Sequence, residues 1–244
     1  GVTLRRFCRA DALLPLSQIV EIGFKCAKAL GYVFRQGLIH RDVKPANILA
    51  LMQGEVVADV KLTDFGSAFD TRSDRTQVHR VGSLAYMSPE QLDGSDIDAR
   101  ADMFSLAAVL FHLVAGRPPF DAQQQGALMH QICNQPPPSL VSLRDGVPPR
   151  MDEIIQRALS KRPADRFDGW DAFADEWSAL VANHEVPRGS LQEVLDSERF
   201  NLLRALEFFA DFGDVELWEV VHRAQWQRHG FGDALYRKGE EGNT

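Results

Sequence analysis

The clearest pattern in the chain is an apolar residue at every third or fourth position between Ser17 and Gly37, which predicts an amphipathic helix. Ser17 is a suitable N-cap residue, and Gly37 can end the helix. Two short apolar runs follow at residues 47–52 and 56–62, and the Gln53-Gly54 pair between them is typical of a turn. We therefore expect a small β-hairpin directly after the helix.

Helical periodicity dominates the chain beyond Pro89, over residues 102–115, 122–134, 151–159 and 168–181. Proline-rich segments separate these stretches, because proline stops a helix and disfavours helical geometry in the residue before it. Residues 69–80 are polar and lack periodicity, which predicts an exposed, mobile loop. The fold class is therefore mainly α with one small β-hairpin region.

Composition and charge narrow the function classes. The chain has 244 residues, 45% hydrophobic and 25% charged, and a formal net charge of -7. An acidic chain attracts nucleic-acid phosphates weakly. Its three cysteines form no CxxC pair, which argues against a disulfide framework and a zinc knuckle. The longest apolar stretch, residues 106–115, is too short to span a membrane, and no signal sequence stands at Gly1, so we expect a cytoplasmic protein.

The residues that carry chemistry flank the predicted hairpin. His40-Arg41-Asp42-Val43-Lys44-Pro45-Ala46-Asn47 precedes its first strand, and Asp64-Phe65-Gly66 follows its second. Because a hairpin folds back on itself, Asn47 and Asp64 are expected to lie close together. Their oxygens could then share a hard cation such as Mg²⁺.

Phosphoryl transfer from a nucleotide requires magnesium ligands, a cation beside the phosphoryl group and a carboxylate that deprotonates the acceptor hydroxyl. Asp42, Lys44, Asn47 and Asp64 are residues of these types. The two motifs resemble the catalytic loop and the metal-binding turn of eukaryotic-type serine/threonine protein kinases. Further segments of that resemblance occur in the family's order: Gly82 to Glu90, Asp102, Gly116 to Phe120, and Arg166.

The resemblance covers residues 1–182 and implies the large, helical lobe of the kinase fold, with ATP and Mg²⁺ as cofactors. It implies that Asp42 is the catalytic base and that Lys44 is the cation near the transferred phosphate. Asn47 and Asp64 would be the magnesium ligands. Leu49 would lie under the adenine.

The resemblance also implies structural roles. His40 would stack on Phe65, the residue before Gly66, in an apolar column that forms in the active state. Asp102 would hold the catalytic-loop backbone. Glu90 would pair with Arg166, for which an ordinary surface salt bridge is the alternative. Ser83 stands in the substrate-docking segment, where the family commonly has Thr.

Arg41 implies regulation, because a cation beside the catalytic Asp usually binds an anion from the loop that follows Asp64. A phosphate on Thr76 would supply that anion, with Thr71, Ser73 and Ser83 as other available hydroxyls. A plain loop threonine at position 76 is the alternative.

The sequence contains no Gly-rich phosphate loop of the G-x-G-x-x-G type, and we interpret the chain as a kinase fragment without the small lobe. We expect a linker at residues 183–190. Three segments, Leu202 to Phe209, Leu217-Trp218 and Gly232 to Gly242, resemble the opening of a cyclic-nucleotide-binding domain. We therefore interpret residues 191–244 as the truncated start of such a domain, a partial α+β segment; a helical appendage that packs on the lobe is the alternative.

The function predicted from the sequence is a protein kinase in signalling that phosphorylates a Ser or Thr hydroxyl of a protein substrate. A cyclic nucleotide bound at the completed C-terminal domain would regulate it. No nucleic acid and no membrane segment is expected. The alternative is a non-catalytic, pseudokinase-like docking module.

Overall fold

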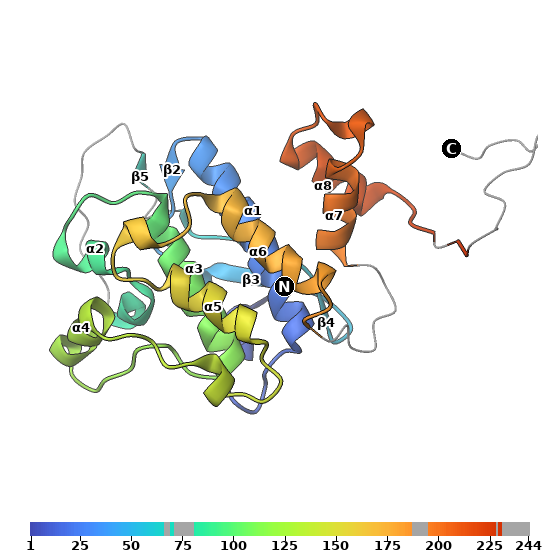
Figure 1. Cartoon of the computed structure of the whole chain (residues 1–244). Helices are drawn as coiled ribbons and strands as arrows, with labels where there is room; N and C mark the ends of the chain where they lie inside the picture. Colours follow the sequence, from blue (N-terminus) through green and yellow to red (C-terminus); the bar gives the residue numbers. More distant parts are fainter. Residues whose placement is uncertain (66–68, 71–80, 187–194, 228, 231–244) are drawn as a thin grey trace, which may run out of the picture.

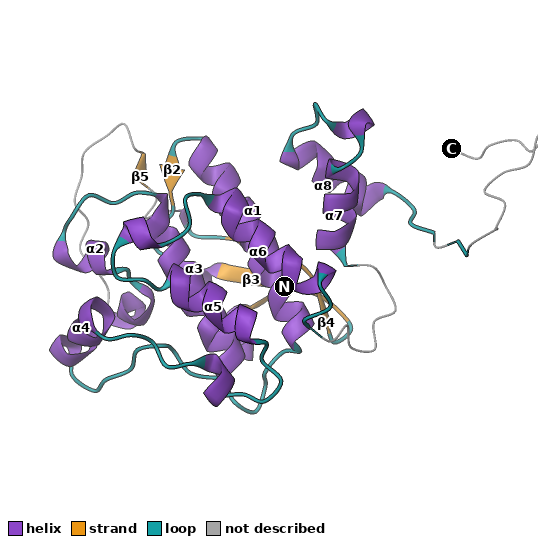
Figure 2. Cartoon of the chain, in the orientation of Figure 1, coloured by secondary structure: helices purple, strands orange, loops and turns teal. Residues whose placement is uncertain are grey.

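The computed structural model describes residues 1–65, 69–70, 81–186, 195–227 and 229–230, and most of them are helical (Figure 2). The helices are α1 (Leu16–Arg35), α2 (Pro89–Asp93), α3 (Ala99–Ala115), α4 (Gln125–Asn134), α5 (Pro149–Ala158), α6 (Trp170–Ala182), α7 (Asp196–Arg204) and α8 (Asp214–Arg223). The strands are β1 (Val2–Thr3), β2 (Leu38–Ile39), β3 (Ile48–Gln53), β4 (Val56–Leu62) and β5 (Phe69–Asp70).

Helix α1 is the centre of the lobe and packs against α3, α6 and β4. It runs beside α6 (Figure 1). Gly23 and Gly31 allow this close approach, since a Cβ atom on either would lie 2.8 Å from Trp177 or Trp170 of α6. Glycine inside a helix costs about 1 kcal/mol relative to alanine. Here the two glycines make room for two tryptophans that α6 buries.

The predicted hairpin is confirmed. Strands β3 and β4 pair antiparallel from Ile48 opposite Leu62 to Gln53 opposite Val56. Strand β1 adds a third strand beside β3, which the sequence pattern missed because two residues carry no periodicity. Phe69 and Asp70 were predicted to begin a loop; instead they form β5, which pairs with β2.

The predicted helices are confirmed with shifted ends. Helix α1 begins at Leu16 after Pro15, so the prediction of Ser17 as its N-cap is wrong. Helix α3 begins at Ala99, ahead of the predicted 102, because the Asp98 side chain caps it by accepting from the Arg100 N–H at 2.7 Å. Beyond Arg100, all residues of α3 are buried except two that are half-buried. Because the helix has almost no polar face, amphipathic periodicity does not show where it begins.

The hydrophobic core continues from the lobe into the C-terminal helices. Phe200 and Leu203 of α7 and Leu217 and Val221 of α8 are buried in the same cluster as the residues of α1 and α6. Figure 1 shows α7 and α8 at the end of the molecule opposite α2 and α4. The described part of the predicted C-terminal domain is therefore a helical pair that packs on the lobe. Its predicted strand and turn, residues 231–244, lie outside the described residues.

The three cysteines are free thiols, and burial raises the pKa of Cys26 to about 12. Within the ranges that the structure describes, no helix is both long and apolar enough to cross a membrane.

Candidate catalytic site

Asp102, in the first turn of α3, holds the backbone of the loop between β2 and β3. Its carboxylate accepts the N–H of His40 at 2.7 Å and the N–H of Arg41 at 2.8 Å. Burial raises the pKa of Asp102, while these donors and the charges of His40 and Arg41 act in the opposite direction. Arg41 adopts a positive φ of 63°, which is uncommon for a residue with a side chain. The loop therefore has a strained conformation that a buried carboxylate stabilises.

Two polar side chains, those of Lys44 and Asn47, contact Asp42. Lys44 Nζ lies 2.5 Å from Asp42 Oδ2, and Asn47 Nδ2 donates to the same oxygen at 3.0 Å and to the Asp42 carbonyl at 2.9 Å. The side chains of Asp42 and Lys44 are 17% and 22% exposed. No hydrogen bond from the described residues reaches the other oxygen, Oδ1. Asp42 is thus oriented through one oxygen and keeps the second available as an acceptor.

The sheet brings Asp64 beside Asn47, as the hairpin predicted. Thr63, directly before Asp64, donates its N–H at 2.9 Å and its hydroxyl at 3.2 Å to the Asn47 carbonyl. Asp64 has a positive φ of 63° and is exposed. Within the described ranges its carboxylate makes no hydrogen bond or ion pair. An uncommon backbone conformation that presents an uncompensated charge is typical of a functional residue.

The donor set fits magnesium. Asn47 uses its amide nitrogen on Asp42, which leaves Oδ1 as its coordinating atom beside the Asp64 carboxylate. Mg²⁺ is usually held by one or two protein oxygens, and phosphates and water complete the shell. In the part of the chain that the structure covers, no group of three or more His, Cys, Asp or Glu could hold a metal. The pair therefore has the oxygen ligands that a nucleotide-completed magnesium site requires.

His40 and Phe65 are in contact, with ring centroids 4.7 Å apart. His40 is buried, and its Nε2 lies 3.0 Å from the Thr63 carbonyl. Phe65 is 40% exposed. The imidazole thus connects the catalytic loop to the turn that carries Asp64.

Glu90 and Arg166 form a two-bond ion pair, Nη1 to Oε1 at 2.6 Å and Nη2 to Oε2 at 2.9 Å. The side chains are 5% and 0% exposed, which does not fit the alternative of a surface salt bridge. The guanidinium also donates to the carbonyls of Ser160, Arg100 and Lys161. This network ties α2 to the segment between α5 and α6.

Leu49 lies in β3, where burial alternates along the strand. Ile48 and Ala50 are buried in the core, so Leu49 belongs to the opposite face of the sheet and is half-buried. The resemblance to protein kinases implies that the adenine would lie against Leu49 on that face.

Other predicted residues cannot be placed. Gly66, Thr71, Ser73 and Thr76 lie outside the described residues, as does the side chain of Ser83. The predicted contact between Arg41 and a phosphate on Thr76 falls in the same part of the chain.

Gln91, in α2, is a site residue that the sequence analysis missed. Its Nε2 donates to the Arg41 carbonyl at 2.9 Å, and its Oε1 accepts the Ser88 N–H at 3.0 Å. The signal in the sequence is Ser88 followed three positions later by Gln, the spacing of a capping box. The contact with the catalytic loop, 50 positions away, has no local signal.

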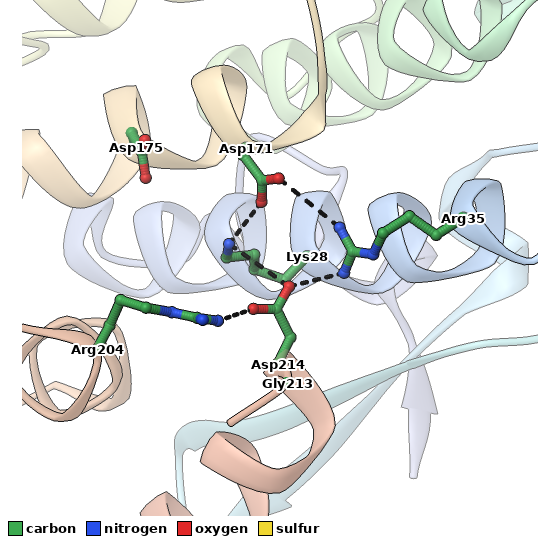
Figure 3. A pocket seen from close by; sticks show the side chains of 7 residues that line it. All are labelled: Lys28, Arg35, Asp171, Asp175, Arg204, Gly213 and Asp214. Atoms are coloured by element: carbon green, nitrogen blue, oxygen red, sulfur yellow. Dashed lines mark hydrogen bonds and ion pairs between the residues drawn. The ribbon is translucent and has the colours of Figure 1, made fainter. Parts of the chain in front are cut away.

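A polar hollow of about 400 Å³ lies among α1, α6, α7 and α8, away from the catalytic-loop residues (Figure 3). Asp214 is its hub. Arg35 contacts it at 2.7 Å, Lys28 at 3.7 Å, and Arg204 also pairs with it. Asp171 of α6 pairs with Lys28 at 2.7 Å. The charges of this hollow bind the C-terminal helices to the lobe.

Comparison with known proteins covers the same region. The protein kinase domain family matches residues 1–178. The serine/threonine-protein kinase PknB of Mycolicibacterium smegmatis is 35% identical over 210 residues, which are 84% of this chain and 32% of that protein. PknF of Mycobacterium tuberculosis H37Rv is 37% identical over 164 residues, 66% of this chain and 34% of that protein. The chain thus spans about a third of the length of these relatives.

Among solved structures, the Rad53 kinase domain and SCD2 in complex with AMPPNP superposes with a TM-score of 0.59 and 25% identity. The match covers 72% of this chain and 65% of that one. A family match over most of the chain and a shared fold agree with the geometry around Asp42. The chain belongs to the protein kinase domain family.

Proposed function

We propose that the protein is a serine/threonine kinase that transfers the γ-phosphate of ATP to a Ser or Thr hydroxyl of a protein substrate. The arrangement at Asp42 carries this proposal: Lys44 and Asn47 fix one carboxylate oxygen and leave the other as an acceptor. Similarity to PknB and PknF, both serine/threonine kinases by name, supports the acceptor class.

In this reaction, the oxygen of the substrate hydroxyl bonds to the γ-phosphorus, and Asp42 Oδ1 accepts the proton of that hydroxyl. The bond from the γ-phosphorus to the bridging oxygen breaks, and ADP leaves. Lys44 stands beside Asp42 and offsets negative charge on the transferred group. Asn47 Oδ1 and the Asp64 carboxylate would hold Mg²⁺, and the ion would neutralise negative charge on the phosphates.

The nucleotide part of the proposal is supported by the AMPPNP in the Rad53 structure and by the position of Leu49. Leu49 supplies an apolar contact for the adenine on the outer face of β3. The sequence has no G-x-G-x-x-G loop over the phosphates. We therefore expect residues 1–244 alone to bind ATP weakly and to transfer phosphate poorly, since the lobe orients one side of the nucleotide.

The test is transfer of labelled γ-phosphate by the complete protein to a generic acceptor such as myelin basic protein or casein. Asp42→Asn should reduce kcat by about a thousandfold or more, because it removes the base while keeping the shape. Asp145→Asn is the matched control on an exposed carboxylate and should leave kcat unchanged. Rates for Asp42→Asn within a few-fold of wild type would exclude Asp42 as the base.

A non-catalytic docking module is the second candidate, and the same assay separates the two. A wild-type protein that neither binds Mg-ATP nor transfers phosphate would support it. The uncompensated Asp64 carboxylate beside Asn47 favours catalysis, since a docking module does not require that charge.

Two finer proposals rest on sequence. A phosphate on Thr76 paired with Arg41 would activate the enzyme. We expect simultaneous replacement of Thr71, Ser73 and Thr76 by Ala to lower kcat.

Regulation by a cyclic nucleotide rests on the resemblance of residues 191–244. Titration of the complete protein with cyclic AMP and cyclic GMP tests it, and absence of binding would exclude the sensor.

A further inference from the structure

Gln91 connects the helix after the substrate-docking segment to the peptide that carries the catalytic carboxylate. It is 6% exposed and lies next to Glu90, which Arg166 anchors. From this fixed helix, its side chain reaches the carbonyl of Arg41 at 2.9 Å.

The orientation of the Gln91 amide follows from its partners. The Ser88 backbone N–H can only donate, and it does so to Oε1 at 3.0 Å; the Ser88 hydroxyl is 3.2 Å from the same atom. The Arg41 carbonyl can only accept, so it must face the NH₂ end. Both ends of the amide are therefore used, and exchanging them would create two repulsive contacts.

The peptide group between Arg41 and Asp42 is held from two sides. Gln91 donates to the oxygen of this peptide, the Arg41 carbonyl. The N–H of the same peptide, which belongs to Asp42, points to His40 Nδ1 at a longer distance of 3.4 Å. The preceding Arg41 N–H is held by Asp102 at 2.8 Å. With φ of Arg41 at 63°, relaxation toward a commoner conformation requires rotation about the Arg41 N–Cα bond. Because Asp102 holds the Arg41 N–H, that rotation moves the Arg41 carbonyl away from Gln91. Among these contacts, the Gln91 bond opposes that rotation most directly.

We propose that Gln91 is a positioning residue for phosphoryl transfer, which fixes the Arg41–Asp42 peptide and thereby aims the Asp42 carboxylate. The inference rests on the proposed kinase function. It also makes the orientation of Asp42 depend on the seating of α2. A substrate-docking segment that is out of place would therefore misalign the catalytic base.

Gln91→Glu is the sharpest variant because it changes one atom of the amide. It keeps an oxygen for Ser88 and places a second oxygen against the Arg41 carbonyl. Loss of a buried hydrogen bond and the resulting repulsion should lower kcat by about tenfold to a hundredfold at a pH of about 8. KM for ATP should change by less than about twofold, because the variant touches no proposed nucleotide contact. Gln135→Glu makes the same chemical change on an exposed side chain and should have no effect.

A pH series separates positioning from a general loss of structure. The introduced carboxyl group is buried and takes up a proton as the pH falls toward about 6, after which its O–H can donate to the Arg41 carbonyl. The ratio of variant to wild-type kcat should therefore rise on acidification, whereas the ratio for Gln91→Met should stay low. The titratable and charged groups on the surrounding elements are His40, Arg41, Asp42, Glu90, Asp102 and Arg166. They are present in every variant, so their own effects on kcat cancel in the ratio of variant to wild type.

Hydrogen exchange of the amides of residues 41–43 supplies a second readout that does not require activity. Exchange should be faster in Gln91→Glu and Gln91→Met than in wild type, and unchanged in Gln135→Glu. The inference would be overturned if the wild type is active and the kcat of Gln91→Glu lies within about twofold of the wild-type value. It would also be overturned if the loss of kcat in Gln91→Glu did not change with pH. An inactive wild type of the complete protein would overturn the proposed kinase function, and the exchange rates would then decide whether Gln91 holds the loop.

Discussion

Asp102 and Arg166 at the catalytic end of the lobe and Asp214 at its C-terminal end are all largely buried, but the partners of these side chains differ. At the catalytic end, Asp102 is bound by two backbone N–H groups, and Arg166 by three carbonyls as well as Glu90. In the hollow at the C-terminal end, Asp214 instead binds the charged side chains of Arg35 and Arg204 (Figure 3).

This difference in partners indicates different functions. Backbone groups belong to elements that packing already holds, so a side chain bound to them fixes the geometry of a loop. Side chains can rotate and exchange partners, so their ion pairs hold two surfaces together without fixing either. We infer that the catalytic end is built for a single geometry, and that the C-terminal helices are docked onto a lobe that keeps its fold without them.

The largest expected effect is at Arg166. Arg166→Met should lower the free energy of unfolding by about 3–5 kcal/mol, because it leaves Glu90 buried without its partner. Urea unfolding of the complete protein measures the change. Arg162→Met, on an exposed arginine nearby, should change it by less than about 0.5 kcal/mol. A loss below about 1 kcal/mol for Arg166→Met would remove the distinction between the two ends.

The next effect concerns the aromatic anchor of the C-terminal helices. Phe200 is 1% exposed and lies 5.8 Å from the Phe24 ring and 4.9 Å from Trp218. Phe200→Ala should cost about 3 kcal/mol, with faster hydrogen exchange in α7 and α8. Phe208→Ala, at a ring that is 78% exposed, is the control. Equal acceleration of exchange in α3 would contradict separate docking.

A smaller effect is a pH dependence of docking through Glu21 of α1. Burial raises its pKa to about 7, opposed by the Ser197 hydrogen bond and by Lys25, while Asp196 adds to the rise. A raised pKa means that the docked state prefers the protonated form. The contribution of Glu21 to docking is therefore full below about pH 4.5 and is lost as the pH rises to about 7.

Glu21→Gln should abolish that pH dependence, which we expect to be on the order of 2 kcal/mol, because an amide does not titrate. Hydrogen exchange of α7 at several pH values between about 5 and 8 measures it. Glu219→Gln, on an exposed glutamate of α8, is the control. A wild type whose docking strengthens as the pH rises would reverse the predicted sign.

How far the sequence predicts each end depends on where the partners lie in the chain. Residues 40–47 and 64–66 are contiguous motifs on either side of a hairpin, and the hairpin follows from local periodicity. Their proximity could therefore be predicted. The bond from Gln91 to Arg41 joins residues 50 positions apart through a backbone carbonyl, which every residue has, so no residue type announces it.

The docking of α7 was predictable in kind but not in detail. The apolar spacing of residues 191–222 predicts helices, yet nothing local specifies that Ser197 meets Glu21, 176 positions earlier, or that Phe200 meets Phe24. The same spacing fits a helical lead-in to another domain, which is the interpretation that the sequence analysis favoured. Partner choice depends on which apolar surface the lobe leaves uncovered, and that is a property of the assembled fold.

The smallest expected effect is at Asp214, the hub of the C-terminal ion pairs. Asp214→Asn should weaken docking by about 1 kcal/mol or less, because Arg35 and Arg204 are 44% and 40% exposed and keep water as a partner. Exposed charges are screened over about 10 Å at 0.1 M salt and about 3 Å at 1 M salt. Hydrogen exchange of α8 in wild type should therefore become faster over that salt range, and exchange in the variant should change less. Asp211→Asn, at an exposed aspartate outside the cluster, is the control. If Asp214→Asn instead destabilised the protein as much as Arg166→Met, the charges at the two ends would carry equal structural weight, and separate docking of the C-terminal helices would be wrong.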